Sequence, residues 1–199
     1  MANTSATGGL LVPGAESPPL TDDALDALFQ VAVSGITGLS GSLVRPRWQP
    51  IPPKHPEPSV DWCAIGITDI TPDDGPSIQH VGSLVGQVGE VGRDDYRRHE
   101  TITLLCTFHG PLAMRYAAKL RDGIGIPQNL EGLKASGIGF IDSGPIRTVP
   151  ELYNQQWIRR FDLALTFRRK VSRTYPILNI ISADPIYTTD TVLITDNGD

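Results

Sequence analysis

The sequence predicts an α+β fold, in which a mostly antiparallel or mixed β-sheet carries about three helices on one face, with a long β-hairpin and flexible terminal arms. Two observations predict it. Several runs alternate apolar and polar residues, as half-buried strands do, and other runs place apolar residues at helical spacing. The chain has 199 residues, of which 40% are hydrophobic, so it can build a core without metals or disulfides.

Composition divides the chain into three parts. Residues 1–20 are small, polar and dotted with proline, which is typical of a flexible N-terminal arm. Residues 21–183 hold all the patterned segments and are expected to form a single α+β domain. Residues 184–199 contain four Asp and no Lys or Arg, so we expect an acidic C-terminal tail.

The first helix is predicted to follow Thr21, whose hydroxyl can cap it, and to end at Gly35 and Gly38. The later elements, in chain order, are a short strand at 43–48, a proline-rich connector through Pro58, strands at 61–70 and 99–108, a helix from 112 that ends at Gly123, a short helix from Pro127 to Gly137, a strand at 138–149 broken at Gly144 and Pro145, and a strand at 157–170. The strands at 61–70 and 99–108 are expected to pair.

Two apolar patterns locate the expected core. The helix that starts at 112 places Leu112, Tyr116 and Leu120 at near-helical spacing. In the last strand one parity is apolar, which predicts a buried face opposite a largely polar one. That parity holds Trp157, Phe161, Leu163, Leu165 and Phe167.

Residues 71–98 separate the two pairing strands. A structureless loop of this length is uncommon inside a compact domain, so we expect an extended hairpin with a flexible tip. Gly82, Gly86, Gly89 and Gly92 are expected at that tip rather than in the core.

The charge pattern excludes several classes of protein. The net charge is −5, with no basic excess for a dedicated nucleic-acid binder. All 17 Lys and Arg residues lie between residues 27 and 183, so a mildly basic body stands between two acidic ends. No run of eighteen apolar residues and no signal-peptide pattern is present, so we expect no membrane span and a cytoplasm-like compartment.

The familiar cofactor and metal motifs are missing. The sequence has no Gly-Lys pair, which excludes a Walker phosphate loop, and its Gly-x-Gly pairs at 123–125 and 137–139 lack the third glycine of a dinucleotide fold. The four histidines are too dispersed for a zinc site. We therefore expect no cofactor and no metal, and we expect Cys63 and Cys106 to be buried and reduced.

Two sets of residues could be taken for catalytic groups. Cys106 and His109 could form a nucleophile and its base, but residues three apart on a strand face opposite sides. Asp73 and Asp74 with Glu100 could bind magnesium, but the PDDGP run is a strong turn sequence. We expect no catalytic residue, and an unrecognised hydrolase using Asp73, Asp74 or His109 stays an alternative.

The basic residues form the one candidate site, a subunit or partner interface. They lie beside the first short strand and along the last long one, with one tryptophan. A solvated sheet face and a contact surface for an acidic partner, including the acidic ends of sister subunits, are the two interpretations. The candidate residues are Arg45, Arg47, Trp48, Arg159, Arg160, Arg168, Arg169 and Arg173.

Most of the chain, roughly Leu25 to Ala183, resembles the tail terminator (neck) proteins of long-tailed bacteriophages. The resemblance rests on the order and extent of non-catalytic segments. These segments are GITGLSGSLVRPRWQP, DWCAIGITDITPDD, RRHETITLLCTFHGP, RYAAKLRDGIGIPQN and GIGFIDSGPIRTVPELYNQQWIRRFDLALTFRRKVSRTYPILNI.

The resemblance implies a structural virion protein without enzyme activity. Such a subunit forms a ring, generally a hexamer, that caps the tail tube in the neck and is assembled in the host cytoplasm. The implied partners are other copies of the chain, the tail tube protein, the head-connector or head-completion protein and, if the tail is contractile, the sheath terminus. The genome would pass through the ring lumen without specific contacts. Another neck or tail component, such as a head-closure or tail-tube protein, is the alternative.

Overall fold

The computed structural model describes residues 9–14, 19–49, 51, 53–82, 91–153 and 155–178. The predicted acidic tail at 184–199, most of the predicted N-terminal arm, Gly86 and Gly89 lie outside these residues.

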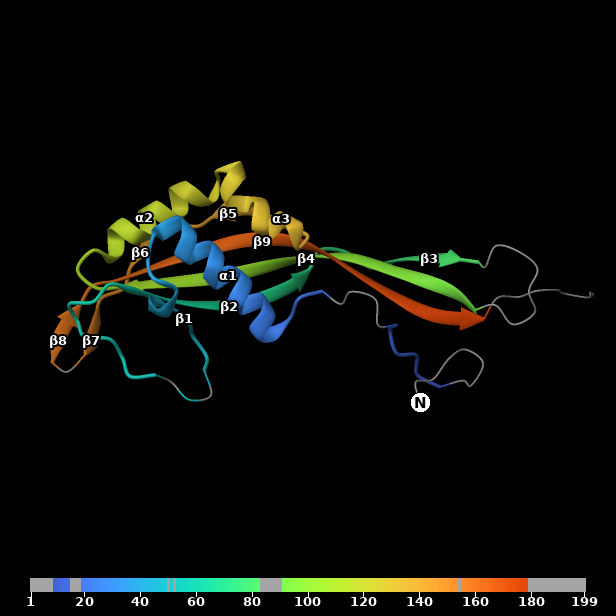
Figure 1. Ribbon diagram of the computed structural model, residues 1–199, viewed down its shortest axis with the longest axis horizontal. Coiled ribbons are helices and arrows are strands. Elements are labelled where there is room, and N and C mark those ends of the chain that lie inside the picture. Colours follow the sequence, from blue (N-terminus) through green and yellow to red (C-terminus); the bar gives the residue numbers. More distant parts are fainter. Residues whose placement is uncertain are drawn as a thin grey trace, which may run out of the picture.

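A twisted β-sheet forms the centre of the described chain (Figure 1). The strand order is β1-β2-β4-β9-β5, with β3 added to β4 and β6 added to β9. β1 and β2 are parallel and all other pairs in this sheet are antiparallel, which confirms the mixed, mostly antiparallel prediction. The strands are β1 (Val44–Pro46), β2 (Trp62–Pro72), β3 (Ser77–Val81), β4 (Val91–His109), β5 (Ile138–Ser143), β6 (Arg147–Thr148) and β9 (Arg160–Leu178).

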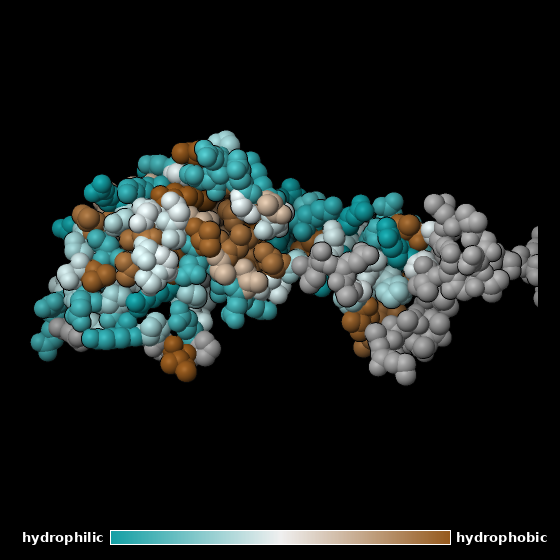
Figure 2. Space-filling view, viewed as in Figure 1, coloured by the Kyte–Doolittle hydropathy of each residue, from teal (hydrophilic) through white to brown (hydrophobic). Residues whose placement is uncertain are grey.

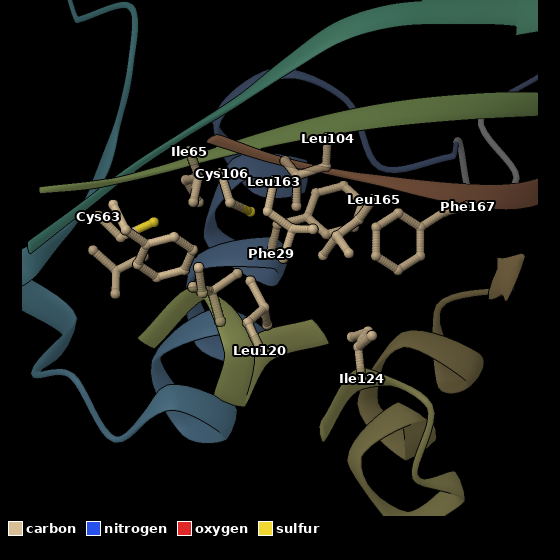
Figure 3. Close-up of a cluster of buried hydrophobic side chains, with 14 of the residues drawn as sticks. Phe29, Cys63, Ile65, Leu104, Cys106, Leu120, Ile124, Leu163, Leu165 and Phe167 are labelled. Carbon is tan, nitrogen blue, oxygen red and sulfur yellow. The ribbon is translucent and has the colours of Figure 1, made fainter. Parts of the chain in front are cut away.

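Helices α1 (Asp22–Thr37), α2 (Ala113–Ile124) and α3 (Glu131–Ala135) cover one face of this sheet (Figure 1). Alternate strand residues point into the space between helices and sheet, where Phe29, Leu120 and Ile124 meet them (Figure 3). Each fully buried Leu or Phe there contributes roughly 1.5–3 kcal/mol of hydrophobic free energy. Cys63 and Cys106 lie in this core and are free thiols, as predicted.

Two glycines that were predicted to end helices lie inside them instead. Gly38 is the C-cap of α1 with φ +79°, but Gly35 lies inside that helix. Gly123, predicted to end α2, lies within it, and Gly125 is the C-cap. The reason is packing: a Cβ at Gly123 would come within 2.6 Å of Ile36 Cγ2, so the missing side chain lets α1 and α2 approach closely.

The buried side of α2 also differs from the prediction. Leu120 is buried as expected, but Tyr116 is half-buried and Leu112 is 45% exposed. Ala113, Ala117, Leu120 and Ile124 form the buried stripe instead. Leu112 is the N-cap residue of α2, so it stands outside the helical repeat that places this stripe.

β4 and β9 continue beyond the helices as a projecting arm (Figure 1). The two strands pair from His109 and Arg160 out to Val91 and Leu178, and β3 pairs with the outer part of β4. The strands of the predicted hairpin at 71–98 are therefore confirmed, and residues 83–90 of its predicted tip lie outside the described residues. The prediction that Gly92 lies at the tip of the hairpin is wrong. Gly92 is a buried residue of β4 and pairs with Ile177 of β9.

The opposite end of the molecule carries a small hairpin, β7 (Glu151–Tyr153) and β8 (Gln156–Ile158). It corrects the prediction that one strand runs from Trp157. The chain leaves the strand conformation at Arg159, and β9 begins at Arg160, so Trp157 belongs to β8 and is 72% exposed. Phe161, Leu163, Leu165 and Phe167 do share the core face, as the alternation predicts.

Candidate interaction surface

The sheet face opposite the helices carries polar and charged side chains. They occupy the strand positions that alternate with the core, because successive residues of a strand point to opposite faces. Threonines predominate among them, and Arg160, Asp162 and Arg168 of β9 add charge. We call this side the open face.

A hydrogen-bonded network organises the open face near the end of β4. Arg160 donates to both carboxylate oxygens of Asp162, at 3.0 and 2.9 Å, and Arg47 donates to Thr107, the strand partner of Asp162. Burial alone would raise the pKa of Asp162, but the hydrogen bonds from Arg160 and Thr107 hold that pKa below its ordinary value. The side chains of Arg47 and Arg160 are therefore held in place by hydrogen bonds to Thr107 and Asp162.

Arg45 and Trp48 flank this network. Arg45 donates to the carbonyl oxygens of Ser42 and Lys54, both at 3.0 Å, and so fastens the proline-rich connector to the end of β1. Trp48 lies on Gly66, where a Cβ would meet its ring at 2.6 Å. The indole is 64% exposed, so it offers apolar area to a partner.

An aromatic cluster that the sequence did not reveal lies at the end of the open face. His109 stacks on Trp62 with ring centroids 4.3 Å apart, and His55 meets Trp62 edge-on and stacks on Tyr153 at 4.5 Å. Its members come from the connector, β2, β4 and β7, which are distant in sequence. The cluster fastens the connector and the β7–β8 hairpin to the sheet.

His109 is held neutral in this cluster. Burial is the main cause that lowers its pKa to about 4, and the positive charges of Arg160 and His55 lower it further. Its Nδ1 has no hydrogen-bond partner among the described residues, and the nearest carboxylate oxygen is Glu151 Oε2 at 3.7 Å. Cys106 lies in the core on the opposite face of β4, as the strand spacing predicts.

Arg168 stands farther along the open face. It donates to Asp73 Oδ2 at 2.5 Å, and Thr101 donates to Asp73 Oδ1 at 2.7 Å. The Thr101 hydroxyl and the Arg168 guanidinium together lower the pKa of Asp73. The PDDGP run is the connection between β2 and β3, in agreement with the turn prediction.

Arg169 does not lie on the open face, which corrects the sequence analysis. It shares the core parity with Phe167, and only 6% of it is exposed. Its guanidinium pairs with buried Glu100 and donates to the carbonyl oxygen of Leu20, where the chain enters α1. Arg98 pairs with the other carboxylate oxygen at 3.1 Å, so Arg169 joins the body, the arm and the start of α1.

The eight predicted residues therefore do not form one patch. Arg45, Arg47, Trp48 and Arg160 gather at one end, and Arg168 shares their face farther along. Arg159 is exposed at the turn between β8 and β9. Arg173 lies in the arm on the same side as Arg169, because both have the core parity of β9.

Within the part of the chain that the structure describes, no group of three His, Cys, Asp or Glu side chains is placed to hold a metal ion. None of the described helices is long and apolar enough to cross a membrane.

Comparison with known proteins gives one result. A family model described as phage neck terminator protein matches residues 23–192, which include all the helices and strands from just inside α1 to the end of β9. A search of curated proteins finds no match. Because the matched span covers most of the chain, the protein belongs to the phage neck terminator family and is a structural component of the phage neck.

Proposed function

We propose that the protein is a ring-forming tail terminator, most simply a hexamer, that caps the tail tube and joins it to the head connector. The observation that carries the proposal is the family match over residues 23–192. The shape supports it, since a helix-covered body with an arm at one end offers the unlike surfaces that a head-to-tail ring requires.

The proposed partners are other copies of the chain, the tail tube protein, the head-completion protein and, in a contractile tail, the sheath terminus. Assembly would take place in the host cytoplasm, and the ring would then stay in the virion neck. We propose no catalytic step. Cys106 and His109 face opposite sides of β4, and the Asp73 carboxylate is occupied by Thr101 and Arg168, which supports an architectural role.

The open face is the proposed contact surface for these partners. Trp48 and Arg168 are exposed on this side, and Arg159 is exposed at the turn between β8 and β9. Arg47 and Arg160 stabilise the face through hydrogen bonds to Thr107 and Asp162. Arg169 stabilises the sheet from the buried side through its ion pair with Glu100.

The test is a pair of charge-reversed proteins supplied to phage that lack this subunit. Arg159→Glu with Arg168→Glu should fold yet yield few joined particles, because the basic surface is reversed. Arg115→Glu with Arg121→Glu on the outer side of α2 is the matched control and should assemble normally. Circular dichroism verifies folding and electron microscopy counts intact particles. Normal assembly of the first variant would contradict the contact surface.

The same particles test the function itself. Phage without the subunit should carry overlong or irregular tails, because nothing ends the growth of the tube. Heads without tails that leak their contents would instead identify a head-closure protein and overturn the terminator proposal.

A further inference from the structure

The outer edge of β2 is open along its second half. β1 pairs with residues 63–65 of β2, and the last bond on that side runs from the N–H of Arg47 to the carbonyl oxygen of Ile65. Over residues 67–72, β4 pairs with the inner edge, and no described strand pairs with the outer edge. Six strand residues give an open edge about 20 Å long. Such an edge is a template for a further strand.

A groove lies beside this edge, between β2 and the first turns of α1 (Figure 1). It has a volume of about 360 Å³, and its apolar lining consists of Leu25, Trp48, Ile67 and Ile70. Figure 2 shows that hydrophobic side chains also gather over the helical layer, so apolar area alone does not distinguish this groove. The open strand edge beside it does.

The groove is acidic as well as apolar. Asp22 and Asp26 of α1 and Asp69 of β2 line it, and Arg169 is the basic residue of its lining. The guanidinium of Arg169 pairs with buried Glu100, so it does not neutralise the three aspartates. The groove therefore attracts a positively charged group.

The aspartates at the start of α1 repel one another. Burial is the main cause that raises the pKa of Asp26, and the charges of Asp23 and Asp22 raise it further. A cation in the groove would relieve this repulsion. Among the described residues, no three carboxylates are placed to hold a metal ion, so the cation that fits is a lysine or arginine side chain.

Another molecule has to supply that side chain. All Lys and Arg residues of the chain lie between residues 27 and 183, and the parts of the chain outside the described residues contain none of them. The edge strands β3 and β5 also contain no Lys or Arg. The basic outer part of β9 already has a neighbour, because the N–H of Gly14 donates to the carbonyl oxygen of Thr174 at 2.7 Å.

We propose that the outer edge of β2 binds an extended basic segment of another neck protein as an added strand. Backbone hydrogen bonds to residues 67–72 hold the segment, and a lysine or arginine side chain enters the acidic groove. Apolar residues of the segment cover Ile70 and Trp48, which are 48% and 64% exposed. The proposal rests on the neck role above and adds the chemistry of one partner.

The test measures the binding of labelled synthetic peptides to the full chain by fluorescence anisotropy. The first peptide alternates valine and threonine around two lysines and has blocked ends. The second has glutamates in place of the lysines, and the third keeps the lysines but carries N-methyl groups on alternate backbone nitrogens. The first should bind at least tenfold more tightly than the others, because the second lacks the charge and the third lacks the backbone donors that the edge requires.

Variants of the chain locate the binding. Asp26→Asn with Asp69→Asn removes two carboxylates from the groove, and neither residue is buried, so the subunit should fold. This variant should bind the first peptide at least tenfold more weakly. Asp122→Asn with Asp142→Asn, on α2 and β5, makes the same change of net charge elsewhere and should bind it normally. Hydrogen exchange with the bound peptide should slow at 67–72 and stay unchanged at 138–143.

Three results would overturn the proposal. The first is binding that survives the groove variant or the N-methyl groups. The second is protection of residues 77–81 or 138–143 in place of 67–72, which would put the peptide on another edge. The third is self-association that mass photometry finds lost in the groove variant but not in its control, which would make a second copy the occupant. A failure of the terminator proposal shows instead in tail length, which these measurements do not involve.

Discussion

At the scale of single residues, His109 makes stability depend on pH. Its pKa is about 4 in the folded chain, against about 6.5 when unfolded. Between these values the unfolded chain binds a proton that the folded chain does not, so the free energy of unfolding falls as pH falls. From pH 6.5 to pH 5 we expect His109 to remove about 2 kcal/mol, measured by urea denaturation across that range.

His109→Gln is the control, because glutamine cannot titrate and is polar enough for the same site. It should flatten the dependence between pH 5 and pH 6.5. The carboxyl groups of Asp73 and Asp162 lose their stabilising contribution at lower pH, since their pKa values are already lowered in the folded chain. An unchanged slope in His109→Gln would show that His109 is not held neutral.

At the scale of elements, the sequence predicted what depends on local pattern. The alternation of Leu163, Leu165 and Phe167 and the cap at Gly38 follow from one strand or one helix end, and both were predictable. Arg169 was not, because its burial depends on Glu100, a partner 69 positions away in sequence. The aromatic cluster around His109 was missed for the same reason.

Gly123 shows how packing between two helices overrides local preference. Gly→Ala inside a helix usually stabilises by roughly 1 kcal/mol. At Gly123 the new Cβ would clash with Ile36, so we expect Gly123→Ala to lower the free energy of unfolding by about 1–2 kcal/mol instead. Gly132→Ala in α3, where a Cβ would meet nothing within 4 Å, is the matched control and should stabilise.

Urea unfolding of the three proteins measures both effects. Adding Ile36→Ala should relieve the clash and restore much of the stability that Gly123→Ala removes, because α1 then has space for the new methyl group. Stabilisation by Gly123→Ala alone would mean that the helices separate without penalty and that the close contact does not hold α1 against α2.

At the scale of the whole molecule, β4 belongs to two regions with different neighbours. Residues 102–108 lie between β2 and β9 beneath the helices, and Ile102, Leu104, Cys106 and Phe108 are fully buried there. Residues 93–97 lie in the arm, between β3 and β9, with no helix over either face. One continuous strand thus joins a helix-covered body to an arm that has no such cover.

Hydrogen exchange along β4 tests this division. In the dilute free subunit, amides at 102–108 should exchange only through global unfolding, whereas those at 93–97 should exchange through local opening of the arm and at least tenfold faster. The interstrand hydrogen bonds are alike in both halves, so the difference arises from the apolar cover above them. Equal protection of the two halves would show that the arm belongs to the cooperative unit of the body.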